Sequence, residues 1–307
     1  VTFVSLATNL VAGVGNLDGK TPQVFLRDTC NGAASTTCTP TTYLISTPDG
    51  TTPGNGPSLE PSVANNGAYV SFKSSASNLG ATAPNANAQQ EIFERATCLP
   101  GTNCAAITTL VSTPDGVTPG NAPSSESKIA SGGRFIVFAS TATNLVNGAG
   151  PVQQIYMYDT CLSAASGCVP GLTLISTPDG STPGNGPSEH PTISLGTGTV
   201  SVSTTTGELV AFASQASNLA ANTANGVSNV FVRKACVGFL SNVSSCTSTT
   251  VLVSHQTGTS PPPANGDSLM PAISGDGHTV AFISAANNLV ANDTNGFYNL
   301  FLGLTSF

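Results

Sequence analysis

Acid–base side chains recur in this sequence at one place in an internal repeat. Glu60, Glu126 and His190 each stand just before a short apolar run, and Met270 occupies the fourth equivalent place. Carboxyl and imidazole groups are the side chains that general acid–base catalysis uses most often. Because the fourth place is apolar and solvated polar residues are common at such positions, we expect no catalysis and keep the three residues as candidates for ligand binding.

Other catalytic motifs are missing from the sequence. It contains no nucleophile elbow, no glycine loop that would hold a phosphate group and no His-Glu-x-x-His metal motif. Tryptophan, the strongest sugar-stacking side chain, is also absent. The sequence therefore predicts a protein that is not an enzyme.

A calcium site is the one metal site that the residue pattern suggests. The segment Asn292-Asp293-Thr294-Asn295-Gly296 places oxygen-bearing side chains at alternate positions before a glycine. Calcium prefers such oxygen ligands, although a single carboxylate supplies little charge. We keep Asp293 and Asn295 as the calcium candidates and expect no other cofactor.

Eight cysteines occur as four close couples, and none is left over. The couples are Cys30 with Cys38, Cys98 with Cys104, Cys161 with Cys168, and Cys236 with Cys246. An even set of this kind predicts local disulfides, because Cys-x-x-Cys spacing and neighbouring histidines, which zinc would require, are absent. Lasting disulfides form in oxidising compartments, so we expect an extracellular or cell-surface protein.

Charged residues make up only 7% of the 307-residue chain, and its net charge is -7. With eight basic residues, the chain offers no cationic surface for a nucleic acid. No apolar stretch is long enough to span a membrane, so none is expected to do so. The chain opens with Val-Thr-Phe-Val and shows no signal peptide, as a mature or trimmed product would.

The fold follows from a repeat. Residues 3–10 have close relatives at residues 72–79, 138–145, 212–219 and 282–289, at a mean spacing of about 70 residues. Three further apolar phrases accompany these copies, and turn-forming residues separate them. Each phrase has the length and composition of a β-strand, and Pro-Asp-Gly or Asn-Gly turns join them. A complete unit is thus an antiparallel meander of four strands, here named a, b, c and d in chain order.

Such a sheet is apolar on both faces, and radial stacking covers both. We therefore predict an all-β fold, a β-propeller of about five four-stranded antiparallel repeats with local hairpin disulfides. The whole chain, residues 1–307, is expected to form one domain. Its repeats are placed at about residues 1–56, 57–122, 123–186, 187–266 and 267–307.

The first and last repeats are incomplete in this sequence. The first begins inside strand b, and the last stops after strand c. Unpaired strand edges are templates for strand addition, so the chain either comes from a longer array or pairs its edges with another molecule. An insertion at residues 197–206 adds a protruding hairpin, which is either a tolerated surface loop or a contact arm.

Two kinds of recurrent polar residue are assigned to turns. Asn9, Asn78, Asn144, Asn218 and Asn288 follow strand b in each copy, and we expect each to close a turn onto its own backbone. Asp49, Asp115 and Asp179 are expected to hold the Pro-Asp-Gly turns.

The segment that begins Pro271-Ala-Ile-Ser-Gly-Asp-Gly and continues through Asp293-Thr-Asn-Gly resembles the WD-like repeats of TolB-type β-propellers. It is similar to a secreted bacterial subgroup with paired cysteines after the third strand. The resemblance spans essentially the whole chain and implies a propeller that serves as an interaction platform. The first-turn Asp-Gly is kept only at Asp276-Gly277.

These patterns together favour a non-enzymatic, exported structural or adhesive repeat protein that assembles end to end through its open blade edges. Its partners would be copies of itself or other surface proteins. The alternative is a propeller module that binds a glycan or peptide at the mouth of its central channel, near Glu60, Glu126 and His190.

Overall fold

The structure is a computed structural model. It describes all residues except 16, 32–37, 66, 81–88, 100–104, 165, 195–206, 222, 224–225, 237–245, 259–260 and 306. The described residues form eighteen strands and no helix. Accordingly, this part of the chain holds no helix that could cross a membrane.

The strands form five antiparallel sheets. Sheet 1 contains β1 (Thr2–Ser5), β2 (Gln23–Asp28) and β3 (Thr41–Leu44). Sheet 2 contains β4 (Ser58–Val63), β5 (Tyr69–Ser74), β6 (Glu91–Ala96) and β7 (Thr108–Leu110), and sheet 3 contains β8 (Ser124–Ile129), β9 (Phe135–Ser140), β10 (Gln154–Asp159) and β11 (Gly171–Leu174). Sheet 4 contains β12 (Ser188–Ile193), β13 (Glu208–Ser214), β14 (Asn229–Ala235) and β15 (Thr249–Leu252), and sheet 5 contains β16 (Ser268–Ile273), β17 (Thr279–Ser284) and β18 (Asn299–Leu304).

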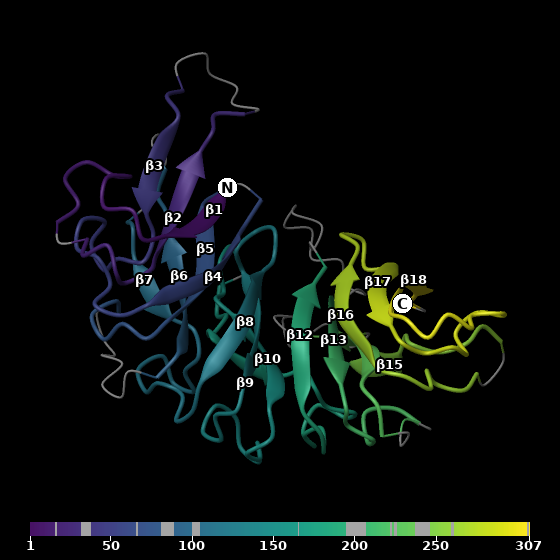
Figure 1. Ribbon diagram of the computed structural model, residues 1–307. Coiled ribbons are helices and arrows are strands. Elements are labelled where there is room, and N and C mark those ends of the chain that lie inside the picture. Colours follow the sequence, from purple (N-terminus) through teal and green to yellow (C-terminus); the bar gives the residue numbers. More distant parts are fainter. Residues whose placement is uncertain are drawn as a thin grey trace.

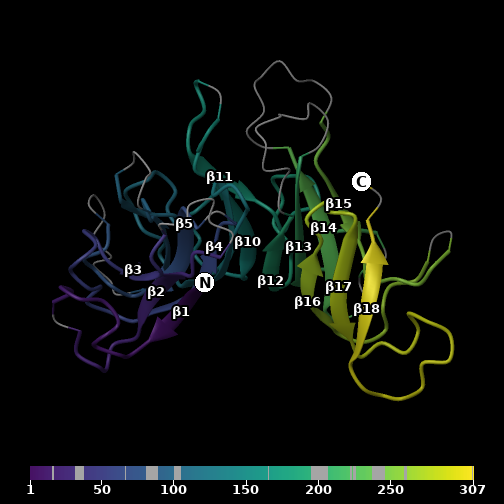
Figure 2. The same cartoon turned by 90° about the horizontal axis from the view of Figure 1, so that it is seen from above.

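The sheets follow one another along an open arc (Figures 1 and 2). Each sheet, together with the loops that connect its strands and follow its last strand, is called a blade, and blades 1 to 5 contain sheets 1 to 5. Strands β4, β8, β12 and β16 lie on its inner side, where each contacts the next. No strand pairing among the described residues joins sheet 1 to sheet 5, so the ring is not closed. The expected all-β propeller architecture of five blades is confirmed, including three strands in the first and last blades.

The core lies between the blades. In sheet 2, Phe72 and Phe93 stack with ring centroids 6.0 Å apart, and corresponding aromatic pairs occur in the other four blades. The Phe72–Phe93 pair packs against Val24 and Leu26 of sheet 1 in one buried cluster. Three further clusters join sheets 2 and 3, 3 and 4, and 4 and 5. Each large apolar side chain buried in this way stabilises the fold by about 1.5–3 kcal/mol.

Buried arginines add polar contacts between blades. Arg95 of sheet 2 donates to the carbonyl of Thr47, in the turn that follows β3, at 3.0 Å and to the Thr108 hydroxyl at 2.9 Å. Arg233 of sheet 4 repeats this contact with the carbonyl of Thr177 in sheet 3. In both cases the guanidinium group bonds to the backbone beside the Pro-Asp-Gly turn of the preceding blade. It can bond to a threonine of its own blade at the same time, because the planar guanidinium carries several N–H donors.

Those turns have the predicted internal geometry. The Asp49 carboxylate accepts the backbone N–H groups of Thr51 and Thr52 at 2.8 and 2.6 Å. These bonds, with one from the Thr52 hydroxyl, hold the pKa of Asp49 well below its usual value. The equivalent bonds in blade 2 lower the pKa of Asp115 to about 2.

The recurrent asparagines behave differently from the sequence-based expectation. Asn78 accepts the N–H of Asn55 at 2.9 Å and donates to the Pro53 carbonyl at 3.0 Å. The same pair of bonds recurs at Asn144, Asn218 and Asn288. Each of these asparagines therefore fastens the loop that enters its blade. For these four asparagines the prediction of a local turn was wrong, because a loop more than 20 residues away supplies better-placed donors and acceptors; for Asn9 it stays a prediction.

Disulfides close the loops between strands c and d. The bonds Cys30–Cys38, Cys161–Cys168 and Cys236–Cys246 confirm three of the predicted pairs. Cys98 is also disulfide-bonded, and its predicted partner Cys104 lies outside the described residues. The predicted hairpin insertion at residues 197–206 lies outside them as well.

A buried hydroxyl–amide contact connects strands c and d. In blade 1, the Ser46 hydroxyl donates to Gln23 Oε1 and accepts the Val24 N–H at 3.0 Å. Gln23 Nε2 then donates to the Gly54 carbonyl at 2.8 Å. Blade 3 repeats the arrangement with Ser176, Gln154 and Gly184.

Blade 2 has a glutamate at this place. Ser112 donates to Glu91 Oε2, whereas Oε1, which corresponds to the amide nitrogen of glutamine, has no hydrogen-bond partner among the described residues. Burial raises the pKa of the Glu91 carboxyl to about 8, and the bonds from Ser112 and Gly120 offset this only in part. Near neutral pH the folded protein thus holds Glu91 protonated, as a neutral counterpart of glutamine.

Replacing Glu91 by glutamine tests this protonation. The unfolded chain loses the Glu91 proton near pH 4.5 and the folded chain near pH 8, so the Glu91 contribution to stability falls as pH rises between these values. We expect Glu91→Gln to match the wild type near pH 4 and to be more stable by about 4 kcal/mol at pH 8. Urea unfolding at both pH values measures the difference.

Blade 3 supplies the matched control. Gln154→Glu places a carboxyl in the equivalent buried site, so its stability relative to wild type should decline over the same pH range. A difference between Glu91→Gln and wild type that does not change with pH would contradict the interpretation.

Candidate functional site

The candidate residues Glu60, Glu126 and His190 lie on the inner strands β4, β8 and β12. All three, with Met270 of β16, have left-handed backbone conformations, with φ between 52° and 60°. The pairing of each inner strand with its neighbour shifts register at this point, for example between Leu59 and Ser62. Each inner strand therefore contains a β-bulge at the same position.

The bulges place a carboxylate of one blade against the backbone of the next. Glu60 Oε2 accepts the N–H of Glu126 at 2.9 Å, and Glu126 Oε2 accepts the N–H of His190 at 2.6 Å. The structure thus brings the three residues together in a chain of contacts from blade 2 to blade 4. We call these two contacts the inner-strand clasp.

The electrostatics of Glu60 agree with this contact. Its Oε1 accepts the Lys73 ammonium group at 2.6 Å. Burial acts to raise the pKa of Glu60, but the bonds from Lys73 and the Glu126 N–H outweigh burial and lower the pKa overall. Both Glu60 oxygens are therefore occupied in the ionised state.

The remaining groups are not arranged as an acid–base pair. His190 Nε2 lies 3.9 Å from Glu126 Oε1, and His190 Nδ1 lies 3.9 Å from Glu189 Oε1, both too long for a hydrogen bond. Instead, the carboxylates of Glu60 and Glu126 each accept a hydrogen bond from a backbone N–H group of the next blade. These two bonds join β4 to β8 and β8 to β12.

Sequence reasoning located these residues but missed the bulge that directs them. A signal was present, because Pro61, Pro191 and Pro271 directly follow three of the four left-handed residues. Proline lacks an N–H group and, within sheets, is confined to edges and bulges. The inner strand of each blade is an edge strand, so proline there did not by itself distinguish a bulge from a regular edge.

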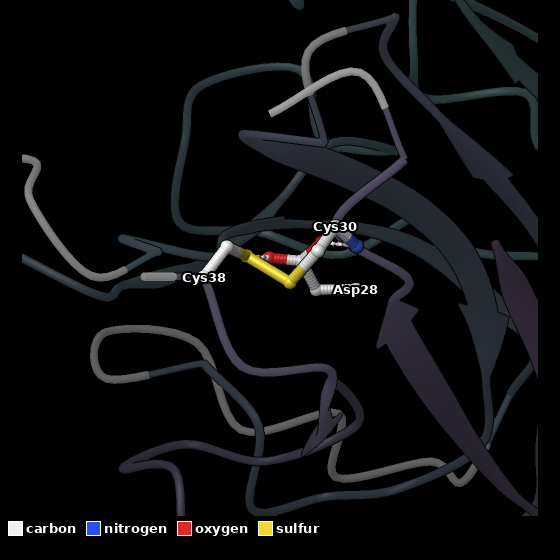
Figure 3. A group of neighbouring side chains, drawn as sticks. All are labelled: Asp28, Cys30 and Cys38. Atoms are coloured by element: carbon white, nitrogen blue, oxygen red, sulfur yellow. Dashed lines mark hydrogen bonds between the residues drawn. A yellow bond between two sulfur atoms is a disulfide. The ribbon is translucent and has the colours of Figure 1, made fainter. Parts of the chain in front are cut away.

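Two clusters of cysteine and aspartate have the composition of metal sites. Asp28 lies beside Cys30 and Cys38 (Figure 3), and Asp159 lies beside Cys161 and Cys168. In both clusters the sulfur atoms are joined in a disulfide, whereas metal coordination requires thiolates.

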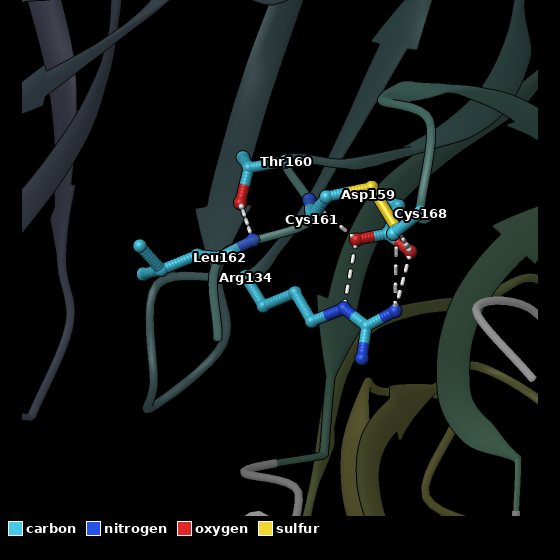
Figure 4. A network of polar contacts seen from close by, with 6 residues as sticks. All are labelled: Arg134, Asp159, Thr160, Cys161, Leu162 and Cys168. Carbon is cyan, nitrogen blue, oxygen red and sulfur yellow. Dashed lines mark hydrogen bonds and ion pairs between the residues drawn. A yellow bond between two sulfur atoms is a disulfide. The ribbon is translucent and has the colours of Figure 1, made fainter. Parts of the chain in front are cut away.

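The aspartates in these clusters brace the disulfide loops. Asp28 accepts the Cys30 N–H at 2.9 Å. Asp159 accepts the Cys161 N–H at 2.8 Å and forms a bidentate ion pair with Arg134, with both N···O distances 2.8 Å (Figure 4). These contacts account for both carboxylates without a metal.

The calcium candidates lie in the loop before β18. Asn299 Nδ2 donates to Asp293 Oδ2 at 3.2 Å and to Asn295 Oδ1 at 3.1 Å. The Phe297 N–H also donates to Asn295 Oδ1, at 2.9 Å. The candidate oxygens face one another across this loop, with the Asn299 amide between them, and calcium binding stays a prediction.

Comparison with known proteins gives structural likeness only. No protein-family model matches the sequence, and no curated protein matches it significantly. Among solved structures, TolB from Acinetobacter baumannii is similar over 94% of this chain and 49% of its own, with a TM-score of 0.40 and 14% identity. The tricorn protease is similar over 87% of this chain and 21% of its own, with a TM-score of 0.44 and 12% identity. The chain thus spans about half of the TolB chain and a smaller share of the protease.

A substitution at Glu126 tests the inner-strand clasp. Glu126→Ala leaves the half-buried His190 N–H without its acceptor, so we expect a loss of about 1–2 kcal/mol in the free energy of unfolding. Glu126→Gln keeps an acceptor oxygen and should lose less than half as much. Chemical denaturation at neutral pH measures both.

Met270→Ala is the matched control, since Met270 has the same left-handed conformation on the same kind of bulge, with an exposed apolar side chain. We expect at most about 0.5 kcal/mol of change there. Equal losses for Glu126→Ala and Glu126→Gln would show that the hydrogen bond is not the cause.

Proposed function

We propose that this chain is a non-catalytic, exported repeat module with a structural or adhesive role, and that it assembles end to end with further copies through the outer faces of its first and last blades. The three disulfides support an oxidising compartment outside the cytoplasm. The low charge of the chain suits contacts made through apolar faces and backbone groups.

The observation that carries this proposal is the exposed face of β18. Leu300, Leu302 and Leu304 alternate along the strand, and their exposed fractions are 73%, 73% and 78%. Their counterparts in blade 1, Val24 and Leu26, are 0% and 3% exposed because blade 2 covers them. Contiguous apolar surface of this kind marks interaction sites.

The opposite end of the arc carries the complementary kind of face. Arg27 of β2 is exposed and donates to the Thr42 hydroxyl at 3.0 Å. Arg95 has the same bond to Thr108, and its guanidinium also bonds to the preceding blade. Arg27 is therefore held in the conformation that contacts a preceding blade elsewhere in the chain. In Figure 2, sheet 1 and β18 lie at opposite ends of the arc, which suits head-to-tail contact.

Ligand binding at the inner strands is the weaker alternative. It would require side chains with free acceptors or donors, but Glu60 and one oxygen of Glu126 are engaged in the clasp and its ion pair. The outward face of β18, by contrast, carries apolar side chains that no described residue covers.

Self-association in sedimentation experiments tests the proposal. We expect the wild type to associate at micromolar concentration and Leu302→Lys to remain monomeric, because a charge cannot enter a buried blade interface unpaired. At concentrations below the association range, thermal unfolding of the variant should match that of the wild type, since the Leu302 side chain is exposed in the single chain.

Val169→Lys is the control, because Val169 is 81% exposed but lies directly after the disulfide-bonded Cys168, before β11, and not in a strand. This variant should associate like the wild type. A wild-type protein that stays monomeric, or a Leu302→Lys variant that still associates, would refute end-to-end assembly through this face.

A further inference from the structure

Strand β18 has one hydrogen-bonded neighbour among the described strands, β17. In blades 1 to 4 the strand equivalent to β18 pairs on its other side with strand d of its blade. Val24, the counterpart of Leu300, directs its N–H to Ser46 Oγ and accepts the Ile45 N–H at 2.9 Å. By the alternation of a β-strand, the backbone groups of Leu300, Leu302 and Leu304 face the open edge of β18.

The segments at strand d of blades 1 to 4 share one short sequence. It reads Leu, then Ile or Val, then Ser, at residues 44–46, 110–112, 174–176 and 252–254. The leucine always stands opposite an aromatic residue of strand c, as in the pairs Phe25 with Leu44 and Tyr156 with Leu174. The same pairing joins Phe93 with Leu110 and Phe231 with Leu252.

Blade 5 has the aromatic residue of strand c but no leucine opposite it among the described residues. Phe301 is the aromatic counterpart and stacks on Phe282 at 5.8 Å. Phe301 is only partly buried, in contrast to the fully buried Phe25, Phe93, Tyr156 and Phe231 of the other blades. A leucine opposite Phe301 would therefore cover apolar surface that is still open.

Asn299 occupies the place of the side chain that binds the serine hydroxyl. In blade 4, Asn229 donates to the Val227 carbonyl at 3.2 Å and accepts the Ser254 hydroxyl at 3.3 Å. Asn299 makes the first of these bonds in the same way, to the Phe297 carbonyl at 3.3 Å. Its Oδ1 accepts Asn295 Nδ2 at 3.0 Å, and an amide oxygen has a second lone pair.

We propose that the open edge of β18 is a strand-addition site for an extended segment with the sequence Leu-(Ile/Val)-Ser. The incoming strand pairs antiparallel with β18 and places its leucine opposite Phe301. Its serine hydroxyl accepts the Leu300 N–H and donates to Asn299 Oδ1. This inference rests on the proposed function, because both treat blade 5 as an interaction surface. It adds the sequence that a partner strand must carry.

A peptide with the sequence of residues 171–180, Gly-Leu-Thr-Leu-Ile-Ser-Thr-Pro-Asp-Gly, is the probe. We expect saturable binding, measured by fluorescence anisotropy of the labelled peptide. Hydrogen exchange should slow at least about tenfold at the amides of Leu300 and Leu302, because strand addition buries these N–H groups. The amide of Phe301 faces β17 and serves as the internal reference.

Peptide variants test the sequence requirement. Replacing the serine by valine, which has a similar shape without a hydroxyl, should weaken binding about tenfold, as loss of one buried hydrogen bond does. Replacing the fourth residue, leucine, by serine should weaken it at least as much. Binding that is equal for all three peptides would overturn the proposed sequence recognition.

Two protein variants separate strand pairing from contact with the apolar face. Leu302→Ser and Leu302→Pro both remove the leucine side chain, but only proline removes the N–H at the open edge. Neither change touches the bonds to β17. We expect Leu302→Ser to bind the peptide within about threefold of the wild type and Leu302→Pro to lose binding. Equal loss in both variants would refute strand addition.

The outcomes distinguish this inference from the assembly proposal. A monomeric wild type that binds the peptide and protects β18 would keep the strand-addition site and remove end-to-end assembly. A wild type that self-associates through Leu302 but shows no peptide-dependent protection of β18 would do the reverse.

Discussion

Each sheet of this protein is apolar on both faces, and the need to cover both faces governs the rest of its structure. A single sheet of three or four strands has no interior of its own. Val24 and Leu26 become buried only because Phe72 and Phe93 of the next blade pack on them. Stability therefore resides in the interfaces between successive blades, as in other repeat proteins. The leucines of β18 stay exposed because no blade among the described residues packs on that face.

Polar contacts between and within blades use few charges. Loops are fastened by asparagine pairs such as Asn55 with Asn78, and inner strands by carboxylates that accept backbone N–H groups. A hydrogen bond of this kind contributes about 0.5–1.5 kcal/mol, so repetition along the chain matters more than any single contact. Two further glutamates are buried without an ordinary carboxylate environment. Burial raises the pKa of Glu94 to about 8 and that of Glu208 to about 7. The contribution of these carboxyl groups to folding stability, like that of Glu91, is therefore largest under mildly acidic conditions and falls as pH rises.

The candidate site shows where sequence reasoning succeeds and where it stops. Equivalent positions in a repeat must occupy equivalent places in successive blades, so the neighbourhood of Glu60, Glu126 and His190 could be predicted. The contacts that they make could not, because a one-residue bulge with a left-handed backbone brings the carboxylates of Glu60 and Glu126 against the backbone of the next blade. These two contacts form the inner-strand clasp, and ligand binding by the three residues stays a prediction. Similarly, the partner of Asn78 lies in a loop 23 residues away in sequence, and only the docking of that loop reveals it.

The strands, their order within each blade and the close disulfide pairs were determined by the sequence alone, because each depends on neighbours within a few residues. Short apolar phrases, turn residues and cysteine spacing act locally, and repetition strengthens each signal. The curvature of the arc, the contacts of Arg95 with a preceding blade and the difference between the buried Val24 and the exposed Leu300 were decided by tertiary structure. They depend on how one blade rotates against the next, which is the summed result of many side-chain contacts between segments far apart in sequence.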